Sequence, residues 1–193
     1  MKYLNFLSAI ALSLLFPLLS FAQSAETVLP VIVSGKDSTW YAQQAKAWEQ
    51  EVQKSPKSEE AWRNLFNAKY YLKYWFNENV TPADSSGDVM NRMEQAIPGT
   101  FTYNYCRYWV DHGQHSDFAD RALDMIPADI DPATVDGLMG YLWRSGAAEG
   151  TGKRAQQFDE LLTRQYHHAY YPDYVLRYSY NQLEGLPENA IYI

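Results

Sequence analysis

One glycine-rich run contains residue types that could bind phosphate. Glu149-Gly-Thr-Gly-Lys153 supplies the glycines and the lysine that a phosphate-binding loop uses. Its spacing does not fit, because Ala147 stands where the leading glycine is needed and Arg154 where a serine or threonine would hold magnesium. No strand is predicted before the run. We therefore interpret it as a turn between two helices, and we expect no nucleotide or other cofactor.

Histidines lie near other polar residues at two places. His112 and His115 are flanked by aspartates, but Gly113 lies between them in a predicted turn, and no third metal ligand is placed by the sequence. His167 and His168 follow a predicted helix, where cationic side chains suit the helix dipole. We therefore expect solvated histidines and no metal site. A catalytic base at His167 or His168 stays open as an alternative.

Residues for nucleophilic catalysis are present in type but not in arrangement. The single cysteine, Cys106, lies among tyrosines and beside Tyr105 and Trp109, which favours a small buried side chain over a reactive thiol. Asp131 precedes Pro132, as is typical of a helix cap followed by a first-turn proline. No run marks a nucleophile turn. The sequence therefore predicts no catalytic residue, and we expect a protein that is not an enzyme.

Aromatic residues are abundant, with 16 Tyr, 8 Phe and 6 Trp. Such side chains combine a large apolar area with a polar tip, so they serve helix packing and partner recognition alike. For the tyrosines near the C-terminus, packing of the last helices is the alternative to partner binding. We expect partner binding to use these residues: Trp48, Trp62, Tyr70, Tyr166, Tyr170, Tyr171, Tyr174 and Tyr178.

The N-terminus predicts export. Lys2 is followed by an apolar run from Leu4 to Phe21, and Ser20 and Ala22 are small residues placed for a signal-peptidase cut. We expect residues 1–22 to be a signal peptide, so that the mature protein lies in the periplasm or outside the cell without a membrane span. An uncleaved anchor is the alternative, although the run is at the short limit for spanning.

The charge of the mature chain excludes some partners. Without Lys2, 15 basic and 23 acidic residues remain, a net charge of −8. An acidic exported protein has no electrostatic reason to bind nucleic acid or an anionic membrane surface. We therefore expect no nucleic-acid partner and no membrane-surface partner; a protein or peptide partner is what the helical resemblance described below implies.

Beyond the signal the pattern predicts helices. Residues 23–36 indicate an extended lead-in, either a short strand or an ordered arm on the first helices, and residues 187–193 form a tail that begins like a strand. Between 37 and 186, apolar residues recur at steps of three and four and no alternating strand pattern occurs. Eight helices are expected, at about 37–52, 58–76, 88–97, 100–113, 116–127, 131–146, 153–166 and 172–183.

One stretch, from Pro56 to Leu72, resembles the boundary and first helix of a tetratricopeptide repeat. The matching residues, with the alanine and proline that end a later second helix, are Pro56, Ala61, Trp62, Asn64, Leu65, Ala68, Ala122 and Pro127. The chain departs from the repeat pattern at Gln44 and Phe66, where small residues are expected. The resemblance implies an α-α superhelix of about four antiparallel helix pairs over residues 37–186, with partner binding on its concave face.

The two ends of the chain resemble the front portion of larger bacterial envelope proteins, in which a tail such as Pro187–Ile193 leads into a strand. This resemblance implies an alternative function, as the helical front or an accessory of a larger enzyme that processes cell-envelope glycans or peptides. We favour an exported, non-enzymatic scaffold, because stacked helix pairs present a continuous binding surface without a fixed catalytic constellation.

Overall fold

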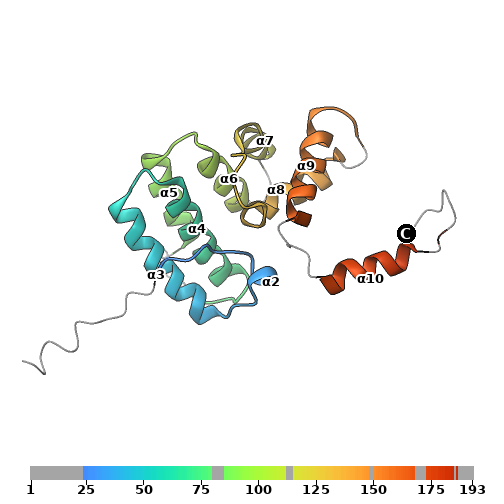
Figure 1. Ribbon diagram of the computed structural model, residues 1–193. Helices are drawn as coiled ribbons and strands as arrows, with labels where there is room; N and C mark the ends of the chain where they lie inside the picture. Colours follow the sequence, from blue (N-terminus) through green and yellow to red (C-terminus); the bar gives the residue numbers. More distant parts are fainter. Residues whose placement is uncertain are drawn as a thin grey trace, which may run out of the picture.

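The computed structural model describes residues 24–79, 85–111, 115–147, 150–167, 173–184 and 186. Every regular element in these ranges is a helix, which confirms the all-α prediction (Figure 1). No helix of the described ranges is both long and apolar enough to cross a membrane. The expected signal peptide and C-terminal tail lie outside the described residues.

The helices begin and end close to the predicted positions. One predicted helix, at 131–146, is instead a short 3-10 helix followed by an α-helix. The elements in chain order are α2 (Val31–Ser34), α3 (Ser38–Lys54), α4 (Glu59–Tyr74), α5 (Ser86–Ala96), α6 (Phe101–Val110), α7 (Ser116–Met125), η3 (Pro132–Val135), α8 (Asp136–Arg144), α9 (Lys153–His167) and α10 (Asp173–Leu183).

Helices α3 and α4 form a hairpin that carries the first part of the core. The Asp37 side chain accepts a hydrogen bond from the Trp40 N–H at 2.9 Å and begins α3, and Ser58 caps α4 through the Ala61 N–H at 3.2 Å. Ten side chains of α4 are buried, because α3, α5 and α6 all pack against it. Helix α4 is therefore the central element of this part of the molecule.

The later helices continue the array. Helix α6 packs against α4, α5 and α7, and α8 packs mainly against α9 (Figure 1). A partly buried ion pair between α3 and α5 joins Glu49 Oε1 to Arg92 Nη2 at 2.6 Å, and the Arg92 guanidinium lies 5.2 Å from the centroid of the Trp62 ring. The hydrogen bond from Arg92 lowers the pKa of Glu49. Together these two contacts link α3, α4 and α5.

The lead-in is an ordered arm, and the alternative of a strand is wrong. Residues 24–30 run without helix across the α3–α4 hairpin, where the Val28 side chain is fully buried. Residues 31–34 then form the single turn α2, which ends at Gly35 because that glycine adopts the left-handed conformation at φ 62°. Side chains of the hairpin hold the arm, because Gln44, Trp48 and Asn64 each bond to its main chain.

The last helix does not complete a fourth pair. Helix α10 has no buried residue, and Figure 1 shows it apart from the other helices. Its apolar side chains therefore lack the neighbouring helix that the predicted pairing with α9 would supply. Among the described residues, the helices from α3 to α9 form a continuous array, which agrees with the predicted all-α class.

Candidate functional site

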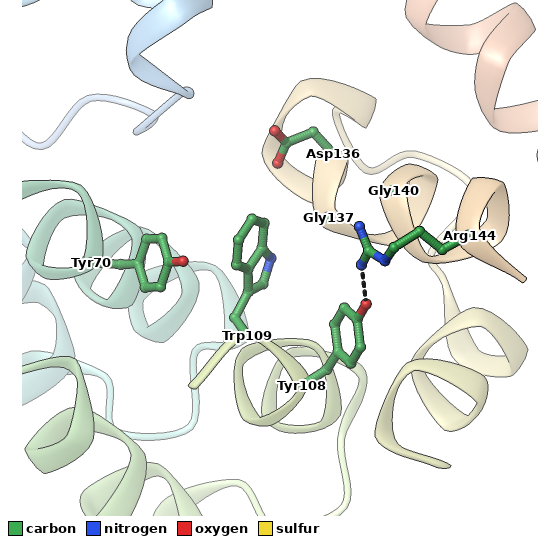
Figure 2. Close-up of a pocket in the computed structure, with 7 residues that line it drawn as sticks. All are labelled: Tyr70, Tyr108, Trp109, Asp136, Gly137, Gly140 and Arg144. Atoms are coloured by element: carbon green, nitrogen blue, oxygen red, sulfur yellow. Dashed lines mark hydrogen bonds between the residues drawn. The ribbon is translucent and has the colours of Figure 1, made fainter. Parts of the chain in front are cut away.

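An open pocket of about 470 Å³ lies between α4, α6 and α8 (Figure 2). Three helices that are separate in sequence supply its walls. The lining residues are Tyr70 from α4, Tyr108 and Trp109 from α6, and Asp136, Gly137, Gly140 and Arg144 from α8. The volume suits a small ligand or one side chain of a larger partner.

The α8 wall is built by helical spacing. Asp136, Gly140 and Arg144 follow one another at intervals of four, so they lie on one face of the helix, and Gly137 lies beside them. A Cβ atom on Gly137 would be 2.4 Å from three atoms of the Trp109 indole. The glycine therefore lets Trp109 lie directly against the α8 backbone, where any other residue would push the indole away.

Aromatic rings form the opposite wall. The ring centroids of Tyr70 and Trp109 are 5.0 Å apart with an interplanar angle of 62°. The Tyr105 ring also packs against Trp109, with its centroid 6.4 Å from that of the indole. Burial, followed by the charges of Tyr74 and Asp136, raises the pKa of Tyr70 to about 12. Tyr70 therefore presents a neutral phenol to the pocket at physiological pH.

Asp136 is the unusual group of the site. It is the first residue of α8, and its Oδ1 atom is buried without a hydrogen-bond partner. Burial raises the pKa of Asp136 to about 6, although main-chain N–H groups at Gly137 and Asp136 itself act in the opposite direction. The carboxyl group is therefore charged at neutral pH but loses that charge under mildly acidic conditions.

Arg144 lies at the other end of the same helix face. Its Nη2 atom donates to the Tyr108 hydroxyl oxygen at 2.6 Å, and the Tyr141 ring lies 5.6 Å from the Tyr108 ring. Arg144 is exposed, whereas Tyr108 is buried. The Arg144 side chain runs back along this face, since its Nη1 atom would lie 3.2 Å from a Cβ atom on Gly140. The pocket thus combines a carboxyl group, a hydrogen-bonded guanidinium and aromatic rings (Figure 2).

Asp136→Asn is expected to raise the free energy of unfolding by about 1 kcal/mol near pH 7, because it removes a buried charge with an unpaired oxygen. The folded-state pKa of about 6 lies above the ordinary value of 3.8, so the native state binds more protons between these values and stability falls as pH rises through them. Below about pH 4 the variant should therefore lose its advantage. Urea unfolding at both pH values measures the difference.

The control for this measurement is Asp117→Asn, because the Asp117 side chain is 62% exposed and should leave stability nearly unchanged at both pH values. A less stable Asp136→Asn variant near pH 7 would contradict the expected cost of the carboxylate.

Of the aromatic residues predicted to bind a partner, Tyr70 lines the pocket. Trp48 and Trp62 do not, because both are buried and donate their indole N–H groups at 2.8 Å, to the carbonyl oxygens of Glu26 and Pro56. These bonds give both tryptophans a structural role, and their partner-binding role stays a prediction. Trp48 also lines a second open pocket, of about 500 Å³, on the α3–α4 hairpin.

The C-terminal tyrosines do not join the pocket. Tyr166 on α9 and Tyr174 and Tyr178 on α10 are all more than half exposed, and none of them lines the site. Tyr170 and Tyr171 lie outside the described residues. Exposure leaves the partner-binding prediction for the described three open, on a surface separate from the pocket.

The other motifs with possible chemistry are occupied by structural contacts. Lys153 and Arg154 both bind Asp124 Oδ1, at 2.8 Å and 2.9 Å, so the charged end of the glycine-rich run ties α9 to α7. The Asp131 side chain accepts from the Ala133 N–H at 2.9 Å, as expected of a cap. These contacts explain the residues without a ligand.

The described histidines and the cysteine also have ordinary environments. His115 precedes α7 with its ring 6.4 Å from that of Phe118, and His167 ends α9 beside Tyr166, while His112 and His168 lie outside the described residues. Cys106 is fully buried, as predicted, and burial raises the pKa of its thiol. Within the described ranges, no three histidine, cysteine or carboxylate groups come close enough to hold a metal ion.

Six of the lining residues were not among the predicted site residues. The signal that could have indicated some of them is the spacing within α8, where Gly137 and Gly140 interrupt a helix that begins with Asp136 and ends with Arg144. Glycine is unfavourable inside a helix, so two on one face indicate a close approach or a binding wall.

Comparisons with known proteins add no further constraint on the site. The chain matched no protein-family model, no curated protein and no solved structure. The role of the pocket therefore has to follow from its own residues.

Proposed function

We propose that this chain is an exported, non-enzymatic scaffold of tetratricopeptide-like helix pairs that binds a protein or peptide partner on its concave face. The observation that carries the proposal is that the pocket walls come from α4, α6 and α8. These helices alternate along the chain with α5 and α7. In a stack of helix pairs, the inner surface is formed by alternate helices. Helices α5 and α7, which pack against α6, would then form the outer layer.

The chemistry of the pocket supports recognition. Binding hot spots are typically aromatic or arginine side chains in largely desolvated pockets, and this pocket contains Tyr70, Trp109 and Arg144. Asp136 is the only carboxyl group among the described lining residues. The described lining includes no histidine, serine or cysteine that could serve beside it as base or nucleophile, which favours recognition over hydrolysis.

Export is proposed from the apolar run between Leu4 and Phe21 and from the small residues Ser20 and Ala22 at its end. The arm that follows supports a boundary between the proposed signal peptide and the folded domain. Residues 24–30 are fixed on the α3–α4 hairpin, so the folded domain begins directly after the proposed signal peptide.

The test is partner capture from cell-envelope extract with the purified protein, followed by titration of each identified partner. Trp109→Leu is expected to weaken binding roughly tenfold or more, because it removes the central ring of the pocket. The matched control is Trp143→Leu on α8, since Trp143 is 68% exposed and lies outside the pocket lining. Circular dichroism checks that both variants fold.

Equal binding by the two tryptophan variants would contradict a concave-face interaction at this pocket. Turnover of glycan or peptide substrates by the purified protein, without any captured partner, would overturn the non-enzymatic assignment.

A further inference from the structure

Helix α10 needs a packing surface that the described part of its own chain does not supply. It has 11 residues, none of them buried, and Figure 1 shows it apart from the other helices. Isolated helices shorter than about 12–15 residues are marginal in water, and most of the stability of a protein helix comes from packing of its apolar face. We therefore expect α10 to be covered by a neighbour.

Apolar residues occupy two opposite faces of α10. Tyr174 and Tyr178 are four residues apart and lie on one face. Leu176, Tyr180 and Leu183 lie on the opposite face, because a step of two residues turns the chain by about 200° around the helix axis. A single neighbouring helix covers only one side. Apolar residues on opposite sides therefore indicate a helix that lies between two neighbours.

Helix α9 carries an apolar ridge on one face. Phe158, Leu162 and Tyr166 follow one another at steps of four, so they share this face. Phe158 is buried, whereas Leu162 is 39% and Tyr166 57% exposed, so the ridge opens to solvent toward the C-terminal end of α9. One chain thus contains both an uncovered apolar helix and an exposed apolar ridge.

We propose that two copies of this chain pair by exchanging α10. Each α10 lies with one apolar face on the α9 ridge of the second copy and with its other face on the α10 of the second copy. A second copy is then the partner of Tyr166, Tyr174 and Tyr178. The inference is independent of the partner proposed at the pocket, because none of these tyrosines lines it.

The two-sided pattern favours a second copy over the two other occupants. If α10 folded back onto the α9 of its own chain, it would cover the ridge but leave its second apolar face in water. A symmetric exchange covers the ridge and both faces of α10 in each copy at once, and such an exchange is a low-cost route to dimers. An unrelated protein would have to bring a matching ridge, which this chain already contains.

The exposed apolar area is close to what a dimer needs. Six residues between 39% and 74% exposed contribute to it, which are Leu162, Tyr166, Tyr174, Tyr178, Tyr180 and Leu183. At about 150–250 Å² for a whole aromatic side chain, the six expose roughly 700 Å² in each chain. A standard interface buries about 800 Å² in each partner.

Charge does not oppose contact between these two helices. Helix α9 has three basic and two acidic residues and α10 has one of each, so their net charges are +1 and 0. The net charge of −8 expected for the mature chain therefore lies elsewhere in the sequence. Repulsion between two such chains acts through solvent, where salt screens it.

The experiment is sedimentation equilibrium of the purified protein, combined with hydrogen exchange of the α10 amides at protein concentrations above and below the dimer dissociation constant. We expect a dimer with a dissociation constant of roughly 1 μM or tighter. Tyr178→Asp on α10 and Tyr166→Asp on α9 should each weaken it roughly tenfold or more, because each places a charge in an apolar contact. Both side chains are more than half exposed, so thermal unfolding of the monomer should stay nearly unchanged.

The matched control is Asn181→Asp, which adds the same charge to the polar stripe between the two apolar faces of α10 and should leave the dissociation constant unchanged. Protection of α10 that rises with protein concentration supports the exchange. A monomer whose α10 is protected at every concentration overturns it in favour of folding back, and a monomer without such protection overturns it as well. A dimer that both tyrosine variants leave intact would place the contact elsewhere and overturn the assignment to α9 and α10.

Discussion

Replacing Val28 with aspartate is expected to lower the free energy of unfolding by about 3 kcal/mol. The Val28 side chain is fully buried, and its main-chain N–H donates to Asn64 Oδ1 at 2.8 Å. Asn67 Nδ2 donates to the Val28 carbonyl oxygen at 3.5 Å. A carboxylate cannot stay charged in this position, so the arm has to leave the hairpin, and the loss is limited to the free energy of arm docking.

Urea unfolding measures the loss in stability, and hydrogen exchange of the residue 28 amide reports whether the arm has left. The matched control is Ile32→Asp, because Ile32 follows in α2 but is 76% exposed, and it should change stability by less than about 0.5 kcal/mol. Similar losses in both variants would show that charge anywhere in this segment is harmful and that Val28 has no special place.

Gly137→Ala is expected to lower stability by about 2 kcal/mol and to abolish ligand binding in the pocket. The added methyl group would lie 2.4 Å from the Trp109 indole, so the ring has to leave its place against α8. The backbone itself accepts alanine, because Gly137 lies within a regular helix and is absent from the residues with positive φ among those described. The effect therefore comes from the ring and the pocket alone.

Gly140→Ala is the control on the same face of α8. There the new Cβ atom would lie 3.2 Å from Arg144 Nη1, which is the flexible end of an exposed side chain. Alanine is a better helix former than glycine, so this variant should gain up to about 1 kcal/mol. Thermal unfolding and the Trp109 indole N–H chemical shift compare the two variants, and equal behaviour would mean that Trp109 is not fixed by Gly137.

The helices could be predicted because their signals are local. Apolar residues at steps of three and four, the capping residues Asp37, Ser58 and Asp131, and the breaks at Pro98 and Gly99 all act within a few residues of the element that they define. The 3-10 turn before α8 was missed, because Asp131 and Pro132 indicate a start without indicating which kind of helix follows.

The pocket could not be predicted in the same way. The aromatic stripes show which rings belong to an apolar face, but Trp48 becomes covered by the arm while Trp109 stays accessible between three helices, and no local pattern separates the two cases. Asp136 carried no sign of its buried oxygen, since burial depends on tertiary packing and not on neighbours in the sequence. Helix α10 shows the reverse, because its amphipathic pattern predicted a cover that the described helices do not provide.

Buried polar residues of the hairpin give a further lesson. Gln44 departs from the alanine expected in the repeat pattern, and in the structure its Oε1 accepts from the Glu26 N–H at 2.8 Å. A departure from a repeat pattern therefore indicated a local function of its own, which is to hold the arm.

The way the arm is held affects how its sequence can change during evolution. Gln44, Trp48 and Asn64 all bond to main-chain groups of the arm, so the identity of the arm residue matters little where its side chain faces solvent, as at Glu26 and Thr27. Exchange of these exposed positions should be nearly neutral, whereas proline at 26 or 28 would remove a needed donor. The stretch beside the proposed export signal can thus drift, or be joined to a different signal, without weakening the domain that follows.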